Sequence, residues 1–146
     1  MSERISRPGQ GLTLDELSLG QVYERKFQVT EQMIEKFAEA SGDVNPIHLD
    51  EEYARKSIFK TRVAHGMLLA GFISAVLGCE FPGAGTIYLG QTLKFLRPTL
   101  IGDEITVKVT IQEMMKEKNR ARLETVCFNQ RGETVLTGEA SVMLPT

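Results

Sequence analysis

One stretch, residues 67–79, constrains the fold more than any other part of the chain. Its sequence, MLLAGFISAVLGC, is apolar on almost every side of a helix and contains no charged residue. A surface helix needs a polar face, so a helix without one is expected to be buried on every side. At about 1.5 Å per residue the helix would be about 20 Å long, which is too short for a bilayer. We therefore expect one central helix with the rest of a small domain wrapped around it.

Strand patterns fill the second half of the chain. Residues 105–111 alternate between apolar and polar side chains, and residues 121–127 and 133–144 repeat this pattern, which is typical of strands with one wet face. Residues 86–96 are rich in Ile, Tyr, Leu and Phe, so we expect a fourth long strand there. Strands joined by short turns predict an antiparallel sheet with the apolar helix on its dry face. The predicted class is α+β.

The first half contains smaller elements. Residues 21–29 are expected to form a strand, and Thr30 is a candidate N-cap for an amphipathic helix that runs to about Ala40. A short charged helical piece is expected at residues 50–56. Residues 1–20 contain several glycines and one proline, so we interpret them as a loose lead-in with at most one short turn.

The composition favours a single soluble domain, residues 1–146. A formal net charge of −2 and a hydrophobic content of 42% argue against a nucleic-acid partner, which would need a basic surface. Cys79 and Cys127 lie in apolar patterns and are interpreted as small buried hydrophobes, which indicates a reducing compartment. Residues 1–11 lack the apolar core of a secretory signal, and no stretch is long enough to span a membrane. A cytoplasmic location is expected.

The richest chemistry lies in residues 41–48, SGDVNPIH. Asp43 and His48 are five positions apart, and the Asn45-Pro46 pair should keep the segment from forming a regular helix or strand. Both side chains could then turn toward one cavity and share a water molecule. The alternative is a solvated turn with a surface histidine. Two features favour the cavity: apolar segments flank the polar loop, and a second histidine, His65, opens the apolar stretch.

A backbone donor could complete this site. Gly66 would stand at the N-terminus of the central helix, where free N–H groups and the helix dipole favour negative charge. The alternative is that Gly66 is small for packing, and for His65 we favour a structural role. The sequence contains no Gly-rich phosphate loop, serine elbow or metal-ligand cluster. A carboxylate, an imidazole and an amide donor suit proton and water transfer at a carbon next to a carbonyl.

Several motifs along residues 20–144 belong together. They comprise Phe37, Ser41, Gly42, Asp43, Asn45, Pro46, Ile47, His48, Ala54, Val63–Leu68, Pro82, Gly83, Gly85, Tyr88, Leu89, Gln91, Phe95, Pro98, Gly102 and Asp103. Together they resemble one family, the MaoC-like (R)-specific enoyl-CoA hydratases of the hotdog fold. The resemblance covers most of residues 20–144. Ala40 departs from it, because a branched residue is expected there.

The resemblance implies an antiparallel sheet around a long central helix, and homodimers or higher even assemblies. It also implies reversible hydration of trans-2-enoyl-CoA to (3R)-3-hydroxyacyl-CoA, in fatty acid or polyhydroxyalkanoate metabolism, without a metal or redox cofactor. The family's catalytic pair falls on Asp43 and His48, its loop asparagine on Asn45 and its oxyanion-hole glycine on Gly66. The sequence leaves open which member of the pair is the base, because two residues sharing one water titrate as a unit.

Two other functions remain as alternatives. A 3-hydroxyacyl-carrier-protein dehydratase would use the same pair on a different thioester handle. A non-catalytic acyl-thioester binding subunit would tolerate loss of Asp43 or His48, so their joint presence argues against it. A hotdog thioesterase is disfavoured, because the central helix contains no carboxylate. Candidates for lining the acyl pocket are Leu68, Phe72, Phe81 and Tyr88.

Overall fold

A computed structural model describes residues 10–146, so the expectations for residues 1–9 lie outside the described residues. Short 3-10 turns cover Leu14–Glu16 and Lys116–Lys118. The regular elements are β1 (Val22–Gln28), α1 (Glu31–Ser41), α2 (Pro46–Leu49), α3 (Glu51–Arg55), α4 (Gly66–Cys79), β2 (Ile87–Gln91), β3 (Lys94–Phe95), β4 (Glu104–Met115), β5 (Arg120–Phe128) and β6 (Thr134–Met143).

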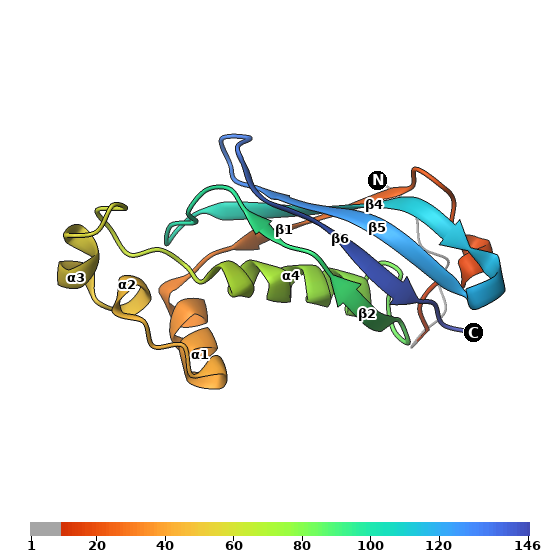
Figure 1. Cartoon of the computed structure of the whole chain (residues 1–146), viewed down its shortest axis with the longest axis horizontal. Coiled ribbons are helices and arrows are strands. Elements are labelled where there is room, and N and C mark those ends of the chain that lie inside the picture. Colours follow the sequence, from red (N-terminus) through yellow and green to blue (C-terminus); the bar gives the residue numbers. More distant parts are fainter. Residues whose placement is uncertain (1–9) are drawn as a thin grey trace.

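The strands form one antiparallel sheet, and α4 lies along its inner face (Figure 1). The strand order is β1-β4-β5-β6-β2, and β3 also pairs with β6. This arrangement confirms the predicted α+β class and the hotdog architecture. The strand expected at 86–96 is divided into β2 and β3 at residues 92–93, where the Thr92 backbone lies close to Gly138 on β6. The register with β6 also shifts inside β2, between Tyr88 and Gly90. Helices α1, α2 and α3 gather beyond the N-terminal end of α4 (Figure 1).

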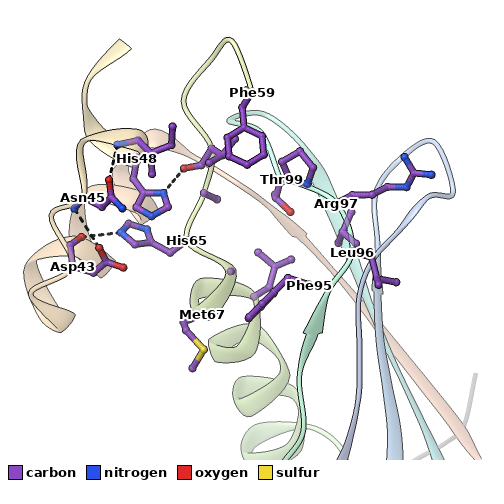
Figure 2. Close-up of a pocket in the computed structure, with 17 residues that line it drawn as sticks. Asp43, Asn45, His48, Phe59, His65, Met67, Phe95, Leu96, Arg97 and Thr99 are labelled. Atoms are coloured by element: carbon purple, nitrogen blue, oxygen red, sulfur yellow. Dashed lines mark hydrogen bonds between the residues drawn. The ribbon is translucent and has the colours of Figure 1, made fainter. Parts of the chain in front are cut away.

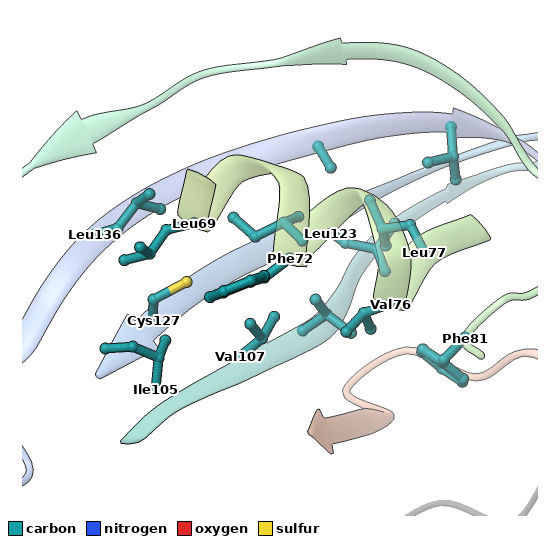
Figure 3. Packing of buried hydrophobic residues seen from close by; sticks show 14 of the residues in the cluster. Leu69, Phe72, Val76, Leu77, Phe81, Ile105, Val107, Leu123, Cys127 and Leu136 are labelled. Carbon is teal, nitrogen blue, oxygen red and sulfur yellow. The ribbon is translucent and has the colours of Figure 1, made fainter. Parts of the chain in front are cut away.

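One face of α4 supplies the centre of the hydrophobic core. Leu69, Phe72, Val76 and Leu77 are buried against the sheet (Figure 3). The opposite face is open in the described chain, where Met67 is 53% exposed and Gly71, Ser74 and Gly78 are also exposed. The expectation that this helix is buried on every side is therefore wrong for a single chain. Among residues 10–146, none of the helices combines the length and apolar character needed to cross a membrane.

The two cysteines differ in their surroundings. Cys127 on β5 is fully buried, and burial raises the pKa of its thiol to about 12. Cys79, at the C-terminal end of α4, is exposed. The interpretation as a small buried hydrophobe is therefore confirmed for Cys127 and wrong for Cys79.

The described part of the lead-in is tied to the core. Leu12, Leu14 and Leu17 are buried, and the backbone N–H of Leu12 donates to the carbonyl of Pro82 at 2.7 Å. The single short turn predicted there is present as the 3-10 turn Leu14–Glu16. The looseness predicted for residues 1–20 is wrong for residues 12–17, because their leucines pack into the core.

Helix α1 begins and ends as the sequence predicts. The Thr30 side chain accepts a hydrogen bond from the backbone N–H of Met33, and Gly42 ends the helix in the left-handed conformation with φ of 82°. The predicted apolar stripe is confirmed, with Ile34 and Ala38 buried. The charged piece predicted at 50–56 corresponds to α3. The polypeptide leaves α1 through Gly42 directly into the segment that contains Asp43.

Close packing of β6 against the β2–β3 connection leads to a prediction about Gly138. A Cβ atom built on Gly138 would lie 1.8 Å from the backbone oxygen of Thr92, and that oxygen belongs to a segment whose N–H is bonded to Glu139. We expect Gly138→Ala to lower the free energy of unfolding by about 3 kcal/mol, because backbone must move to admit the methyl group. Urea unfolding followed by circular dichroism measures this loss.

The matched control is Gly90→Ala on β2, where a Cβ atom would meet nothing within 4 Å. Its effect should stay below about 0.5 kcal/mol. Equal effects of the two substitutions would contradict the prediction.

Candidate active site

Short side-chain-to-backbone hydrogen bonds shape the segment that follows α1. Asp43 Oδ1 accepts from the N–H of Asn45 at 3.2 Å, and Asn45 Oδ1 accepts from the N–H of Ile47 at 3.1 Å. The second bond makes Asn45 the N-cap of α2, with Pro46 in the first helical turn. His48 therefore lies on a one-turn helix, and the expectation that this segment contains no regular helix is wrong from Pro46 onward.

Residues 62 and 63 hold His48 in place. The N–H of Val63 donates to the carbonyl of Ile47 at 3.3 Å, and His48 Nδ1 donates to the carbonyl of Val63 at 2.7 Å. Arg62 Nε donates to the carbonyl of His48 at 2.8 Å, and its guanidinium also pairs with Glu31 on α1 at 2.7 Å. Helix α2 is thus fixed to the strand-like segment that leads into α4.

That segment is itself attached to the connection between β3 and β4. The N–H of Ala64 donates to the carbonyl of Thr99 at 2.7 Å, and Val63 forms an isolated antiparallel bridge with Leu100. Because Thr99 is buried, this attachment is shielded from water. Residues 63–64 therefore join the connection between β3 and β4 on one side to α2 on the other.

The hydrogen bond to Val63 also fixes the tautomer of His48. A carbonyl oxygen can only accept, so Nδ1 must carry the hydrogen. In the neutral ring Nε2 then holds the lone pair. His48 is therefore arranged to use Nε2 as a base, or as an acid once it is protonated.

His65 lies directly against His48 and the backbone of Asp43. It is 2% exposed, its ring stacks on that of His48 with centroids 3.8 Å apart, and its Nε2 donates to the backbone carbonyl of Asp43 at 3.0 Å (Figure 2). The structural role predicted for His65 fits its burial. Its Nδ1, however, is buried without a hydrogen-bond partner among residues 10–146.

The spacing of the Asp43 and His48 side chains suits a shared water molecule. Asp43, His48 and His65 each offer one ligand atom, and these atoms lie within 4.8 Å of one another. Two hydrogen bonds of about 2.8 Å that meet at one water place their outer atoms about 4.6 Å apart. A metal ion fits less well, because imidazoles bind metals in the ring plane. Two stacked rings 3.8 Å apart cannot both direct an in-plane lone pair at one ion.

These residues open onto one cavity of about 480 Å³. Asp43, Asn45, His48 and Gly66 all line it, so the structure brings together the four predicted site residues. Gly66 is the first residue of α4, where backbone N–H groups receive no intrahelical partner. It also packs closely, because an added Cβ would lie 2.6 Å from the Phe95 ring.

The residues predicted for the acyl pocket lie elsewhere. Leu68 and Phe72 face the core, where Phe72 stacks on Phe27 with centroids 4.2 Å apart, and Phe81 is fully buried near the far end of α4. Tyr88 lies on β2 beside a separate hollow. None of the four predicted residues lines the cavity that contains Asp43, so the prediction is wrong for this cavity.

The opposite wall of the cavity was missed by sequence reasoning. It is formed by Phe59, by Phe95 at the end of β3 and by residues 96–99, which lead from β3 toward β4. Phe95 and Pro98 belong to the motif that resembles the MaoC-like family, and this was the only available signal. No local pattern places a loop about 50 residues away beside His48.

Comparisons with known proteins agree with this geometry. A family model described as the MaoC like domain matches residues 16–130. An (R)-specific enoyl-CoA hydratase from Rhodospirillum rubrum is 50% identical over 117 residues, which cover 80% of this chain and 81% of that protein. A 3-hydroxybutyryl-CoA dehydratase from Methylorubrum extorquens is 45% identical over 134 residues, which cover 92% and 85%.

A solved structure shows the same likeness. The unliganded R-hydratase PhaJ1 from Pseudomonas aeruginosa is 46% identical to this chain, with a TM-score of 0.89 over 93% of this chain and 87% of that one. The family model spans most of the described residues, including α1, α2 and α4 around the cavity. The chain therefore belongs to the MaoC-like family.

Proposed function

We propose that the chain is an (R)-specific enoyl-CoA hydratase, which reversibly hydrates trans-2-enoyl-CoA to (3R)-3-hydroxyacyl-CoA. The relatives named for hydratase and dehydratase activity support the reaction class. The observation that carries the assignment to this site is that Asp43 and His48 line one cavity within reach of a shared water. A cytoplasmic location and the absence of a metal or redox cofactor stay predictions.

The cavity supplies each group that hydration requires. One member of the pair removes a proton from water as its oxygen attacks C3, and the other delivers a proton to C2. The N–H of Gly66 stabilises the negative charge that develops on the thioester oxygen. Protons balance in either assignment of base and acid.

An assay with crotonyl-CoA tests the activity, since hydration removes the absorbance of the conjugated thioester. We expect Asp43→Asn and His48→Ala each to lower kcat by about 10²-fold or more, the usual effect of losing a positioned acid or base. Chiral analysis of the product should give the (R)-alcohol. Crotonyl-carrier-protein thioester, assayed in parallel, distinguishes the hydratase from a carrier-protein dehydratase.

Asp50→Asn is the matched control for Asp43→Asn. Asp50 is exposed and caps α3 by accepting from the N–H of Tyr53 at 3.2 Å, a role that asparagine also fills. Its kcat should stay close to the wild-type value. If a folded Asp43→Asn protein turned over as fast as the control, Asp43 would have no part in the chemistry.

The role of Gly66 as an oxyanion donor can be separated from its role in packing. Gly66→Ala and Gly66→Pro both add a Cβ atom against Phe95, but only proline removes the N–H. His65 has φ of −61° and ψ of 132°, a conformation that tolerates a following proline, and proline suits a first helical turn. We expect Gly66→Pro to have a kcat about 10²-fold lower than Gly66→Ala.

Phe95 is 51% exposed, so its ring can move to admit the methyl group and Gly66→Ala should keep most of the activity. Thermal unfolding of both variants measures the cost of crowding. Equal turnover in the folded alanine and proline variants would place the oxyanion donor elsewhere.

We also propose that the functional form is a homodimer. The open face of α4 adjoins β2, an edge strand on which Ile87 is 54% and Leu89 42% exposed. An unpaired edge strand beside an open apolar helix face favours pairing with a second copy across a two-fold axis. The small residues Gly71 and Ser74 on that face would allow close approach.

Gly71→Glu tests this surface. A Cβ atom at Gly71 would meet nothing within 4 Å in the single chain, so the fold should tolerate glutamate, whereas a charge buried between two copies is costly. We expect light scattering to show a lower mass for this variant than for the wild type. Gln112→Glu, which adds the same charge at an exposed position on β4, should leave the mass unchanged. A monomeric wild-type protein with full activity would contradict the proposal.

A further inference from the structure

His65 stands out as a buried polar residue for which the proposed mechanism has no use. Its ring lies between residues 41–48 and the start of α4. The ring also contacts the Phe37 ring, with centroids 4.8 Å apart. As the residue preceding α4, it forms no side-chain capping bond. Burying an imidazole with one unpaired nitrogen is unfavourable compared with burying an apolar side chain of similar size. The stacking on His48 and the hydrogen bond to the Asp43 carbonyl indicate a role in the arrangement of the site.

Helix α2, which contains His48, has more hydrogen bonds to distant parts of the chain than residues 41–45, which contain Asp43. His48 is fixed by three hydrogen bonds between α2 and residues 62–63. In the described chain, the hydrogen bonds of residues 41–45 run to partners no more than four positions away, with one exception. That exception is the bond from His65 Nε2 to the Asp43 carbonyl. Because residues 41–45 are all exposed, little packing replaces that bond if it is lost.

We infer that His65 is a positioning residue that sets the distance between Asp43 and His48. Its Nε2–H holds the Asp43 backbone, whereas His48 is already held by the hydrogen bonds between α2 and residues 62–63. This inference rests on the proposed function, because it assigns His65 to the same acid-base pair. His65 acts through its neighbours, since the nitrogen that reaches Asp43 is already occupied and Nδ1 is buried.

Two substitutions separate the donor from the ring. His65→Gln removes the ring but keeps an N–H donor in a position close to Nε2, whereas His65→Phe keeps a flat ring of similar size and removes the donor. We expect His65→Phe to lower kcat about 10-fold or more with little change in KM, because a small misplacement of a reacting group is costly. His65→Gln should keep kcat within about 3-fold of the wild type.

Thermal unfolding of the two variants distinguishes a positioning role from a purely structural role. Phenylalanine removes an unpaired buried nitrogen and fills the space, so His65→Phe should be at least as stable as His65→Gln. Stability and turnover should therefore rank the two variants in opposite order. Turnover that simply follows stability would overturn the inference.

A measurement without substrate separates this inference from the proposed function. Hydrogen exchange at the amides of Val44 and Asn45 should be faster in His65→Phe than in the wild type and near the wild-type rate in His65→Gln. Unchanged exchange in His65→Phe would overturn the inference whatever the enzyme's activity. If neither variant folds, nitrogen NMR of the wild type decides, because a neutral His65 with its hydrogen on Nδ1 could not donate to Asp43.

A double substitution checks that His65 acts through Asp43. In an Asp43→Asn background the side chain that His65 positions has lost its acid-base function, so adding His65→Phe should lower kcat by less than about 3-fold further. A full additional 10-fold loss would show that His65 works independently of Asp43 and would overturn the inference.

Discussion

The hydrogen bonds on the two sides of residues 63–64 are the constraint on which the site depends. On one side Ala64 bonds to Thr99 beside the sheet, and on the other Val63 bonds to α2 and to His48. Helix α4 begins only two residues later, at Gly66. The same short segment therefore fixes His48 and the start of α4 relative to each other. In this way the proposed acid-base group, His48, and the proposed amide donor, Gly66, are held at a fixed distance from each other, although neither lies in the sheet.

Local chemistry explains which parts of this arrangement could be predicted. The limits of α1 follow from the Thr30 cap and from Gly42, and the alternating strands follow from their period of two. The pocket residues could not be predicted in the same way. A helix that is apolar all round carries no signal of which face meets the sheet. Phe72 was thus assigned to the pocket although it faces the core, whereas Met67 was missed.

The remaining errors concern contacts between distant parts of the chain. The break between β2 and β3 coincides with the close approach of Thr92 to Gly138, which no pattern within residues 86–96 reveals. The burial of Leu12 depends on a backbone bond to Pro82, 70 positions away. In both places tertiary packing overrides a weak local preference. Glycine, which packs closely without a side chain, gives no sign in a single sequence of what it will contact.

The open face of α4 connects the proposed assembly to the proposed chemistry. Met67 lines both the cavity that contains His48 and the hollow beside Tyr88 on β2. A second copy covering that face would therefore also form part of the wall around the cavity. Excluding water there would strengthen the proposed interaction between the thioester oxygen and the Gly66 amide. Because Asp43 lies on an exposed segment held by a single distant bond, association and the His65 contact would act on the same acid-base pair from different sides.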